Sequence, residues 1–438
     1  MIRAIEIRGF RSLRHVRLEL GRLNVLIGPN QSGKTNVLDA LSFLANAASG
    51  RLHESVFKQR GGFSNLLWMG EGPREIQFRV ELGIRLIMAP PPAGTPAALP
   101  IPAVYRFTLE EAGGGYVVTE EALHIKERPI FERDSSTCIV HPEAVHPQPK
   151  DPFKLALSGD QQQGLFLPTL RHSPLGGITP LGYYDVTDIA VYPGFDVRTR
   201  WASTDPRDTA PMRQPQFVEN ASLLSPLGDN LVNVLYALSQ GAGAAYGPAN
   251  GGPRRDRWRE FKDALRVGFP DFEDLVFPAD AGMGRISFAW LDRRFPGRRI
   301  PADVLSDGTL CFLALTAAVM SPGVPALTAI DEPEKHLHPE LLYRLVGVLE
   351  QASAGRQILV TTHSDALLSF LTDPSSVILV DNGAEGTTLT RPDRSALDEW
   401  LKEYTLGELR EAGHLQAFVG AGGESEPSQV IASDGGKQ

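Results

Sequence analysis

A short glycine-rich stretch near the N-terminus has the residue types and spacing that hold a polyphosphate. It fits the pattern G-x-x-x-x-G-K-[ST], and it lies between the apolar run LNVLI and a helical pattern. Its residues are Gly28, Pro29, Asn30, Gln31, Ser32, Gly33, Lys34 and Thr35, and Asn36 follows as a further candidate contact. In such a loop Lys34 would reach the β- and γ-phosphates and the Thr35 hydroxyl would bind Mg²⁺. A chance glycine loop is the alternative, which the strand–loop–helix context disfavours. Residues 28–35 are called the phosphate loop below.

Two carboxylates end an apolar run far along the chain, in ALTAIDEPE (326–334). Asp331 is suited to hold Mg²⁺ through its water, and Glu332 to polarise an attacking water. An ordinary acidic strand end is the alternative. His336 and His338 follow in EKHLHP, where a metal pair is conceivable. A polar loop before a helix with Pro339 near its start is the favoured interpretation.

Two further segments carry candidate phosphate contacts. QILVTTHS (357–364) reads as a buried strand ending at His363, which could hydrogen-bond a γ-phosphate; a packed histidine is the alternative. The LSDG segment, Leu305 to Gly308, opens an apolar helix. Ser306, Asp307 and Gly308 give that helix a hydroxyl and an open N-terminus for an anion. A plain N-cap made by Ser306 or Asp307 explains the same residues.

The elements around these residues predict an α/β fold. Residues 2–8 and 23–27 read as strands, and the segment from about 74 to 128 as hairpins. After helical patterns at 229–240 and 255–269, the chain alternates helix and strand from 306 to 381, which indicates a largely parallel sheet. We therefore expect an ATPase-like head with a mixed or antiparallel β lobe and a helical insertion.

The predicted organisation has four parts. The N-terminal half of the head with the β lobe spans 1–215, and the helical insertion spans 216–282. The C-terminal half of the head spans 283–420, and a disordered tail spans 421–438.

Composition narrows the class of protein. The chain has 438 residues, net charge −9 and two cysteines, Cys138 and Cys311, which fits a reducing cytoplasm. We see no apolar run long enough to span a membrane and no signal-peptide core. The acidic balance argues against a surface coated in nucleic-acid-binding charge. Local basic clusters remain: six arginines in residues 1–22, and Arg254, Arg255, Arg257, Arg259 and Lys262 around Trp258. Solvated faces, with Trp258 and Phe261 packing their helix, are the plainer interpretation.

The motifs resemble, in type and order, those of ABC-type ATPases. The resemblance is to the RecF/SMC branch and most closely to stand-alone ATPases related to OLD (overcoming lysogenization defect) proteins. It rests on IRGFRSL (7–13), GPNQSGKT, LSDGTL (305–310), AIDEPEKHLHP (329–339) and TTHS (361–364). The middle of the chain matches only loosely.

The resemblance implies how two phosphate-binding segments serve one site. In that family the helix after the LSDG-type segment completes the nucleotide site of a second subunit. Ser306 and Gly308 would then contact the γ-phosphate held by Lys34 of the other copy. The same resemblance makes Arg11 a candidate nucleotide or Mg²⁺-site contact, and a surface arginine after a strand is its alternative. ATP and Mg²⁺ are the implied cofactors, and a homodimer or higher oligomer with shared ATP sites is the implied assembly.

Several positions depart from the family pattern. The segment is LSDGT rather than LSGGQ, so Asp307 places a carboxylate close to the expected γ-phosphate, which would slow dimerisation or hydrolysis. Gln77 in EIQFRV is a candidate for the Q-loop, and an exposed strand residue is its alternative. The 269 residues between Thr35 and Leu305 contain too many prolines and glycines for long coiled-coil arms. We expect no fused Toprim nuclease.

Two functions follow as hypotheses. The first is an ATP-hydrolysing switch that dimerises around ATP and acts in DNA repair or anti-phage defence, with Glu332, His363 and Lys34 in catalysis. The second is a nucleotide-gated scaffold that holds or regulates a separately encoded nuclease or toxin, with little turnover. DNA and such an effector are candidate partners, and a membrane is not. A transporter subunit, a kinase and a GTPase are disfavoured.

Overall fold

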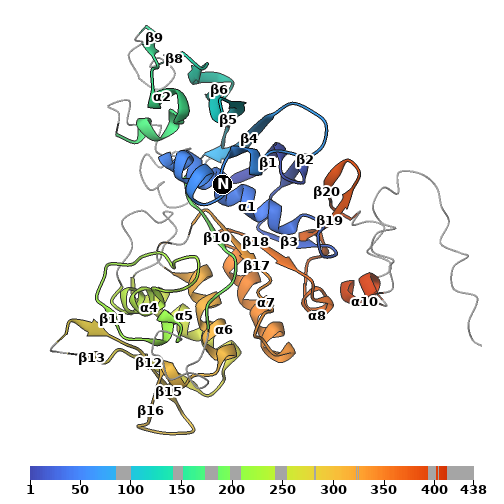
Figure 1. The fold of residues 1–438 in the computed structure, drawn as a ribbon. Helices are drawn as coiled ribbons and strands as arrows, with labels where there is room; N and C mark the ends of the chain where they lie inside the picture. The colour runs from blue at the N-terminus through green and yellow to red at the C-terminus, as the bar shows by residue number, and fades with distance from the viewer. Residues whose placement is uncertain are drawn as a thin grey trace, which may run out of the picture.

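The architecture comes from a computed structural model with side chains. It describes residues 1–84, 100–141, 151–172, 186–197, 209–241, 254–280, 283–321, 323, 325–392, 401–402 and 404–411. Figure 1 shows an upper part made of long antiparallel strands, a central sheet, and a lower part rich in helices. The tail predicted at 421–438 lies outside the described residues.

The central sheet has six strands and connects the two ends of the chain. Its order is β10 (Ile189–Tyr192), β17 (Leu327–Asp331), β18 (Gln357–Thr362), β3 (Leu23–Ile27), β19 (Val377–Gly383) and β20 (Gly386–Thr390). The first five strands run parallel and β20 pairs antiparallel with β19. All six residues of β18 are buried, as expected for a strand covered on both faces. The predicted parallel sheet is confirmed.

The second sheet is antiparallel and has eight strands. Its order is β2 (Leu13–Glu19), β1 (Ile2–Phe10), β4 (Glu75–Ile84), β5 (Ile101–Ala112), β6 (Gly115–Ile125), β7 (Arg128–Arg133), β8 (Thr137–Val140) and β9 (Phe153–Ala156). Its inner face packs aromatic rings against α1, as where Phe43 lies 5.8 Å from Phe78. This sheet is the predicted antiparallel lobe.

Helices cover both faces of the central sheet. Along β3, Leu26 faces the core that holds the antiparallel sheet and α1, while Val25 and Ile27 face the core of the lower helices. The helices are α1 (Lys34–Asn46), α2 (Asp160–Gln163), α4 (Leu231–Ser239), α5 (Arg254–Gly268), α6 (Asp307–Met320), α7 (Pro339–Ser353), α8 (Asp365–Ser369) and α10 (Leu406–Glu411). One side of the sheet therefore carries α1 and the other carries α4 to α8.

Short elements complete the lower part. Two three-stranded sheets pair β11 (Gln216–Phe217), β14 (Arg285–Ile286) and β13 (Ala279–Asp280), and β12 (Phe272–Val276), β15 (Ala289–Asp292) and β16 (Arg299–Pro301). The single turns are η1 (Ala47–Arg51), η2 (Glu54–Lys58), η3 (Phe63–Asn65), η5 (Leu167–His172), η7 (Pro211–Arg213), η8 (Ala302–Val304) and η9 (Pro374–Ser376). The predicted division at 282/283 stays a prediction: it falls between β13 and β14, which pair with each other, and α4, α5 and α6 share one core.

No helix in the described ranges combines the length and the apolar run needed to cross a bilayer.

A buried glutamine joins the first strand to the central sheet. The Gln357 side-chain oxygen accepts a hydrogen bond from the Ile2 N–H at 2.8 Å, and its amide nitrogen donates to the Ile2 carbonyl at 2.7 Å and the Gly21 carbonyl at 3.2 Å. Gln357 is 1% exposed, so water cannot replace these bonds.

Replacing Gln357 with leucine is expected to lower the free energy of unfolding by about 3 kcal/mol, because the buried N–H and carbonyl of Ile2 lose their partner. Chemical unfolding of both proteins measures the difference. The control is Gln351→Leu on the exposed face of α7, which should stay within about 0.5 kcal/mol of the parent. Equal stability of the Gln357 and Gln351 variants would contradict the role assigned to Gln357.

Candidate functional site

The phosphate loop packs closely against β19 and β20 of the central sheet. A Cβ on Gly28 would lie 2.0 Å from the Val380 carbonyl oxygen. Gly33 has φ of +105°, and a Cβ there would lie 2.1 Å from the Thr387 hydroxyl oxygen. Only glycine fits such close approaches and such a backbone angle, which explains both glycines of the pattern.

Lys34 opens α1 and turns its side chain into the loop. Its ammonium donates to the Gly28 and Pro29 carbonyls, each at 2.9 Å, and to Ser32 Oγ at 3.3 Å. Burial lowers the pKa of Lys34, while the carboxylates of Glu332 and Asp331 act in the opposite direction. The phosphate loop therefore surrounds the ammonium group of its own lysine, Lys34.

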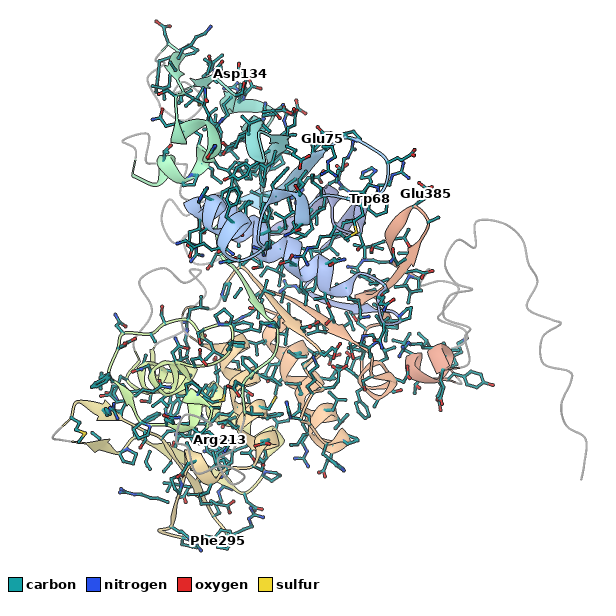
Figure 2. All side chains as sticks on the ribbon, in the orientation of Figure 1. Trp68, Glu75, Asp134, Arg213, Phe295 and Glu385 are labelled. Atoms are coloured by element: carbon teal, nitrogen blue, oxygen red, sulfur yellow. The ribbon has the colours of Figure 1, made fainter. Side chains whose placement is uncertain are left out.

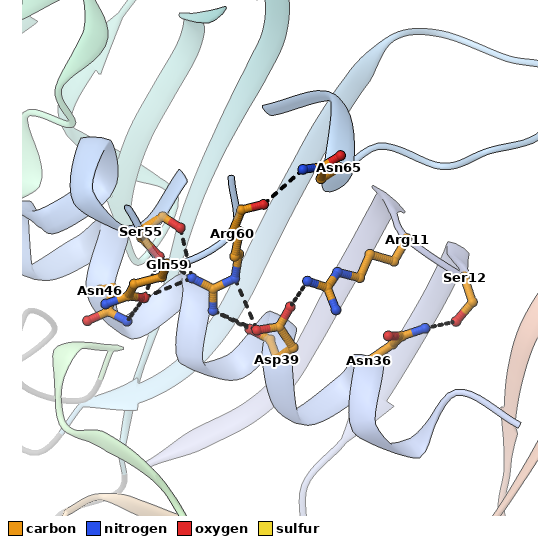
Figure 3. A network of polar contacts seen from close by, with 9 residues as sticks. All are labelled: Arg11, Ser12, Asn36, Asp39, Asn46, Ser55, Gln59, Arg60 and Asn65. Atoms are coloured by element: carbon orange, nitrogen blue, oxygen red, sulfur yellow. Dashed lines mark hydrogen bonds and ion pairs between the residues drawn. The ribbon is translucent and has the colours of Figure 1, made fainter. Parts of the chain in front are cut away.

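Four other residues of the loop are open to solvent. Pro29, Asn30, Gln31 and Thr35 are exposed, whereas Ser32 is buried. Asn36 donates from its side-chain nitrogen to Ser12 Oγ at 2.7 Å, which ties the start of α1 to the β1–β2 turn (Figure 3).

Strand register brings three motifs to one edge of the central sheet. Asp331 on β17 lies opposite Thr361 on β18, and Thr362 lies opposite Ile27, the last residue before the phosphate loop. Asp331 Oδ1 accepts a hydrogen bond from Thr361 Oγ1 at 2.5 Å. Because the strands are parallel, their carboxyl ends share an edge, where ligands of open α/β sheets bind.

Glu332 lies at this edge, and each of its carboxylate oxygens contacts a different side chain. One oxygen lies 3.1 Å from Lys335 Nζ and the other 3.4 Å from His363 Nε2. The backbone of Glu332 has φ of +46°. Among described non-glycine residues with positive φ, Arg11, Gln31, Glu332 and His336 all belong to the motif segments. Such angles are costly for residues with a Cβ and cluster at functional sites.

His363 is fixed through its backbone. Its N–H donates to Glu334 Oε1 at 3.0 Å, and its carbonyl accepts from Arg410 at 3.0 Å. Burial lowers the pKa of His363, and the nearby Lys34 charge lowers it further. The imidazole is therefore neutral at pH 7 and can both accept and donate one hydrogen bond.

Glu334 and Arg410 are the residues that the sequence analysis missed. Glu334 Oε1 also accepts from Thr362 Oγ1 at 2.7 Å, and its other oxygen is buried without a hydrogen-bond partner. Its position in AIDEPE was the only signal. Arg410 lies on α10 and donates to Asp365 Oδ1 at 2.5 Å as well as to the His363 carbonyl. No pattern in the sequence connects α10 with the histidine strand.

Arg11 points to a carboxylate on α1. Its guanidinium lies 3.1 Å from Asp39 Oδ2, and Arg60 binds the other oxygen of Asp39 at 2.7 Å (Figure 3). Arg11 has φ of +49°, and its N–H donates to the Leu66 carbonyl. The nucleotide contact predicted for Arg11 stays a prediction, and the structure shows an ion pair between Arg11 and Asp39 of α1.

The LSDG segment presents an open helix end. Ser306 Oγ accepts from the Thr309 N–H at 3.1 Å, so Ser306 is the N-cap of α6. Ser306 is exposed, and Asp307 forms an ion pair with Arg213 at 2.6 Å. Gly308 lies beside the His336 carbonyl of the same chain. Within the described part of the chain, neither Ser306 nor Asp307 has a hydrogen bond or ion pair with the phosphate loop.

His338 and Pro339 lie where a polar loop leads into a helix, as expected. His338 Nδ1 accepts from the Glu340 N–H, and Pro339 is the first residue of α7. The Q-loop candidate Gln77 lies on β4 and donates to Glu75 at 2.9 Å.

Two residues of the basic cluster on α5 form ion pairs. Lys262 contacts Asp274 at 3.0 Å, and Arg259 contacts Asp263 at 3.8 Å. Trp258 stacks on the buried Phe261 with ring centroids 5.5 Å apart, so these rings pack the helix as expected. The side chains of Arg254 and Arg255 are not among those that the structure describes.

Motif order, sheet topology and the shared edge are those of a P-loop nucleotide-binding domain, and they fit the resemblance to ABC-type ATPases of the SMC/RecF kind. Two family models match. One, described as "AAA ATPase domain", matches residues 1–78. The other, described as "AAA domain, putative AbiEii toxin, Type IV TA system", matches residues 221–369.

Solved SMC head domains are also similar to this chain. An SMC head bound to the C-winged helix domain of ScpA is 12% identical with a TM-score of 0.49, covering 91% of this chain and 99% of that one. A Pyrococcus furiosus Smc head with an extended coiled coil, bound to the C-terminal domain of ScpA, is 12% identical with a TM-score of 0.48, covering 92% and 98%. The Thermotoga maritima SMC head domain is 14% identical with a TM-score of 0.41, covering 90% and 99%.

Proposed function

We propose that the chain binds ATP with Mg²⁺ and hydrolyses it, and that two copies close head to tail around two nucleotides. The observation that carries this proposal is an asymmetry. The phosphate loop, Asp331, Glu332 and His363 share one edge of the sheet, whereas the exposed Ser306 end of α6 has no polar contact with that loop.

Each residue has a role that follows from its chemistry. Lys34 and the loop amides hold the β- and γ-phosphates, and Thr35 and Asp331 would hold the metal ion. A Mg²⁺ ion held there would offset the negative charge of the phosphate groups. Glu332 orients and deprotonates the attacking water, and neutral His363 hydrogen-bonds the γ-phosphate side. Ser306 and Gly308 of the partner copy close the site with a helix N-terminus.

The biological proposal is a switch in DNA repair or anti-phage defence. The matched family description names a toxin of a toxin–antitoxin system, which supports the defence setting. DNA-stimulated hydrolysis would support action on DNA. The ion pairs of Arg259 and Lys262 reduce the positive charge that α5 offers to a phosphate backbone.

A nucleotide-gated scaffold with slow turnover is the second candidate. It is favoured by the engagement of Glu332, whose carboxylate contacts both Lys335 and His363 and must leave them to act as a base. Single-turnover hydrolysis decides between the two. A stable complex with a nuclease or toxin and no DNA dependence supports the scaffold, and repeated turnover supports the switch.

The Ser306→Arg variant tests the shared site. A bulky cation at the exposed helix end should prevent ATP-dependent dimerisation while each monomer still binds ATP, because the phosphate loop is untouched. Light scattering and ATP titration measure the two properties. The control is Ser136→Arg in the exposed β7–β8 turn, which should dimerise like the parent. A Ser306→Arg protein that dimerises normally would show that α6 does not contribute to a partner's site.

A further inference from the structure

Arg213 is a buried arginine that binds the segment leading into α6. Its guanidinium donates to the Val197 carbonyl at 3.0 Å, the Ala302 carbonyl at 3.2 Å and the Leu305 carbonyl at 2.7 Å. It also donates to Asp307 Oδ1 at 2.6 Å. Figure 2 labels Arg213 within the packed side chains of the lower part. One side chain therefore fastens η7, η8 and the start of α6.

Asp307 is the carboxylate that forms an ion pair with Arg213, while the charges of Asp303 and Asp196 contribute less. The Arg213 side chain is 0% exposed, and its other hydrogen bonds in the described part of the chain go to neutral backbone carbonyls, whereas Asp307 is 45% exposed. A buried cation without a counter-ion is strongly unfavourable. Asp307 thus has a structural reason to replace the glycine of an LSGG sequence: its carboxylate completes the environment of Arg213.

This pairing changes what Asp307 does near a phosphate. A free carboxylate at the second position of the LSDG segment would repel an anion at the helix N-terminus. With Oδ1 bound to Arg213, the negative charge is offset by a guanidinium at hydrogen-bond distance. The helix end keeps its ability to attract an anion, because the pair carries no net charge.

We propose that Arg213 is the positioning residue of the LSDG segment and that Asp307 is its counter-ion. Together they hold Ser306 and the first amides of α6 in the arrangement that receives a partner's phosphate. The part that concerns the phosphate rests on the proposed shared site. The part that concerns the geometry of the segment does not.

The first experiment needs no nucleotide. Hydrogen–deuterium exchange is measured across residues 305–310 in the parent and in Arg213→Lys, Asp307→Asn and Asp303→Asn. Lysine keeps the charge but loses the forked contacts, and asparagine keeps the shape but loses the counter-charge. Both should raise exchange of the Thr309 and Leu310 amides roughly tenfold, because loss of a charged hydrogen bond favours local opening.

Asp303→Asn is the matched control. Asp303 is exposed on η8 and its charge acts on Arg213, but Arg213 donates to the Asp303 backbone carbonyl rather than to its carboxylate. Exchange at 305–310 should stay at the parent level. Unchanged exchange in both Arg213→Lys and Asp307→Asn would overturn the positioning role.

The second experiment measures ATP-dependent dimerisation in a Glu332→Gln background, with Asp307→Gly added to create LSGG. If Asp307 acts as a counter-ion, dimer affinity falls about tenfold, a size typical of coupling between sites. If Asp307 only repels phosphate, dimer affinity rises in Asp307→Gly. Under that alternative, removal of the nearby Asp303 charge in Asp303→Asn should also raise dimer affinity. A rise with Asp307→Gly would overturn the proposal.

The two proposals fail in different ways. A Glu332→Gln parent that stays monomeric with ATP and Mg²⁺ removes the shared site, and the exchange experiment then decides the role of Arg213 alone. If both single variants fold poorly, the stability of the double variant Arg213→Gln with Asp307→Asn decides whether the two residues are paired. Because both charges leave together, the double variant should lose less stability than the sum of the single losses. Simple additivity would contradict the pairing.

Discussion

Changing Glu332 to glutamine is expected to reduce ATP hydrolysis by about 10²- to 10³-fold, in line with the loss of a general base. Glutamine keeps the size of the side chain and cannot accept the proton of the attacking water. The phosphate loop and Asp331 are unchanged, so ATP binding should persist. The same variant should accumulate an ATP-bound dimer, since closure no longer leads to hydrolysis. Phosphate release and light scattering with ATP and Mg²⁺ measure both effects.

The matched control is Glu340→Gln, in the exposed first turn of α7. It should hydrolyse ATP like the parent. Turnover by the Glu332 variant within about twofold of the parent would exclude Glu332 as the base. A strictly monomeric variant with ATP and Mg²⁺ would exclude the shared site.

The Lys34→Ala variant is expected to lose ATP affinity by about 10²-fold or more, because charged hydrogen bonds to phosphate disappear from the centre of the loop. Lys34 is 4% exposed and contacts three groups of its own loop, so alanine also leaves those acceptors unpaired. Isothermal titration with ATP and Mg²⁺ gives the affinity, and circular dichroism checks the fold.

Lys58→Ala serves as the control, because Lys58 is an exposed cation on η2. Its ATP affinity should equal that of the parent. A Lys34 variant that binds ATP within about threefold of the parent would mean that the loop is not the nucleotide site.

The regular elements of the head were predictable from periodicity. The helices that begin near 307 and 339 and the strands at 327–331 and 357–362 have apolar patterns with one dominant period, and the structure places them within a residue or two. The phosphate loop and the Asp331–Glu332 strand end were predictable because a local pattern fixes them.

The contacts that orient the site were not predictable, because they join residues distant in sequence. Arg410 reaches His363 from 47 positions away, and Arg213 reaches Asp307 from 94 positions away. No sequence pattern near either arginine indicates which residue it contacts. Arg11 illustrates the same limit, since the sequence shows a cation after a strand but not the Asp39 carboxylate that binds it.

The position of β3 also constrains how the polypeptide reaches its native state. This strand lies between β18 and β19, and Asn24 bonds the Ile358 carbonyl across 334 positions. During synthesis β3 emerges early, while both neighbours are still untranslated. Its hydrogen-bonding edges must wait for most of the chain, and long-range pairing of this kind slows folding and exposes the strand to aggregation. The nascent protein is therefore expected to depend on chaperones until the ribosome releases its last third.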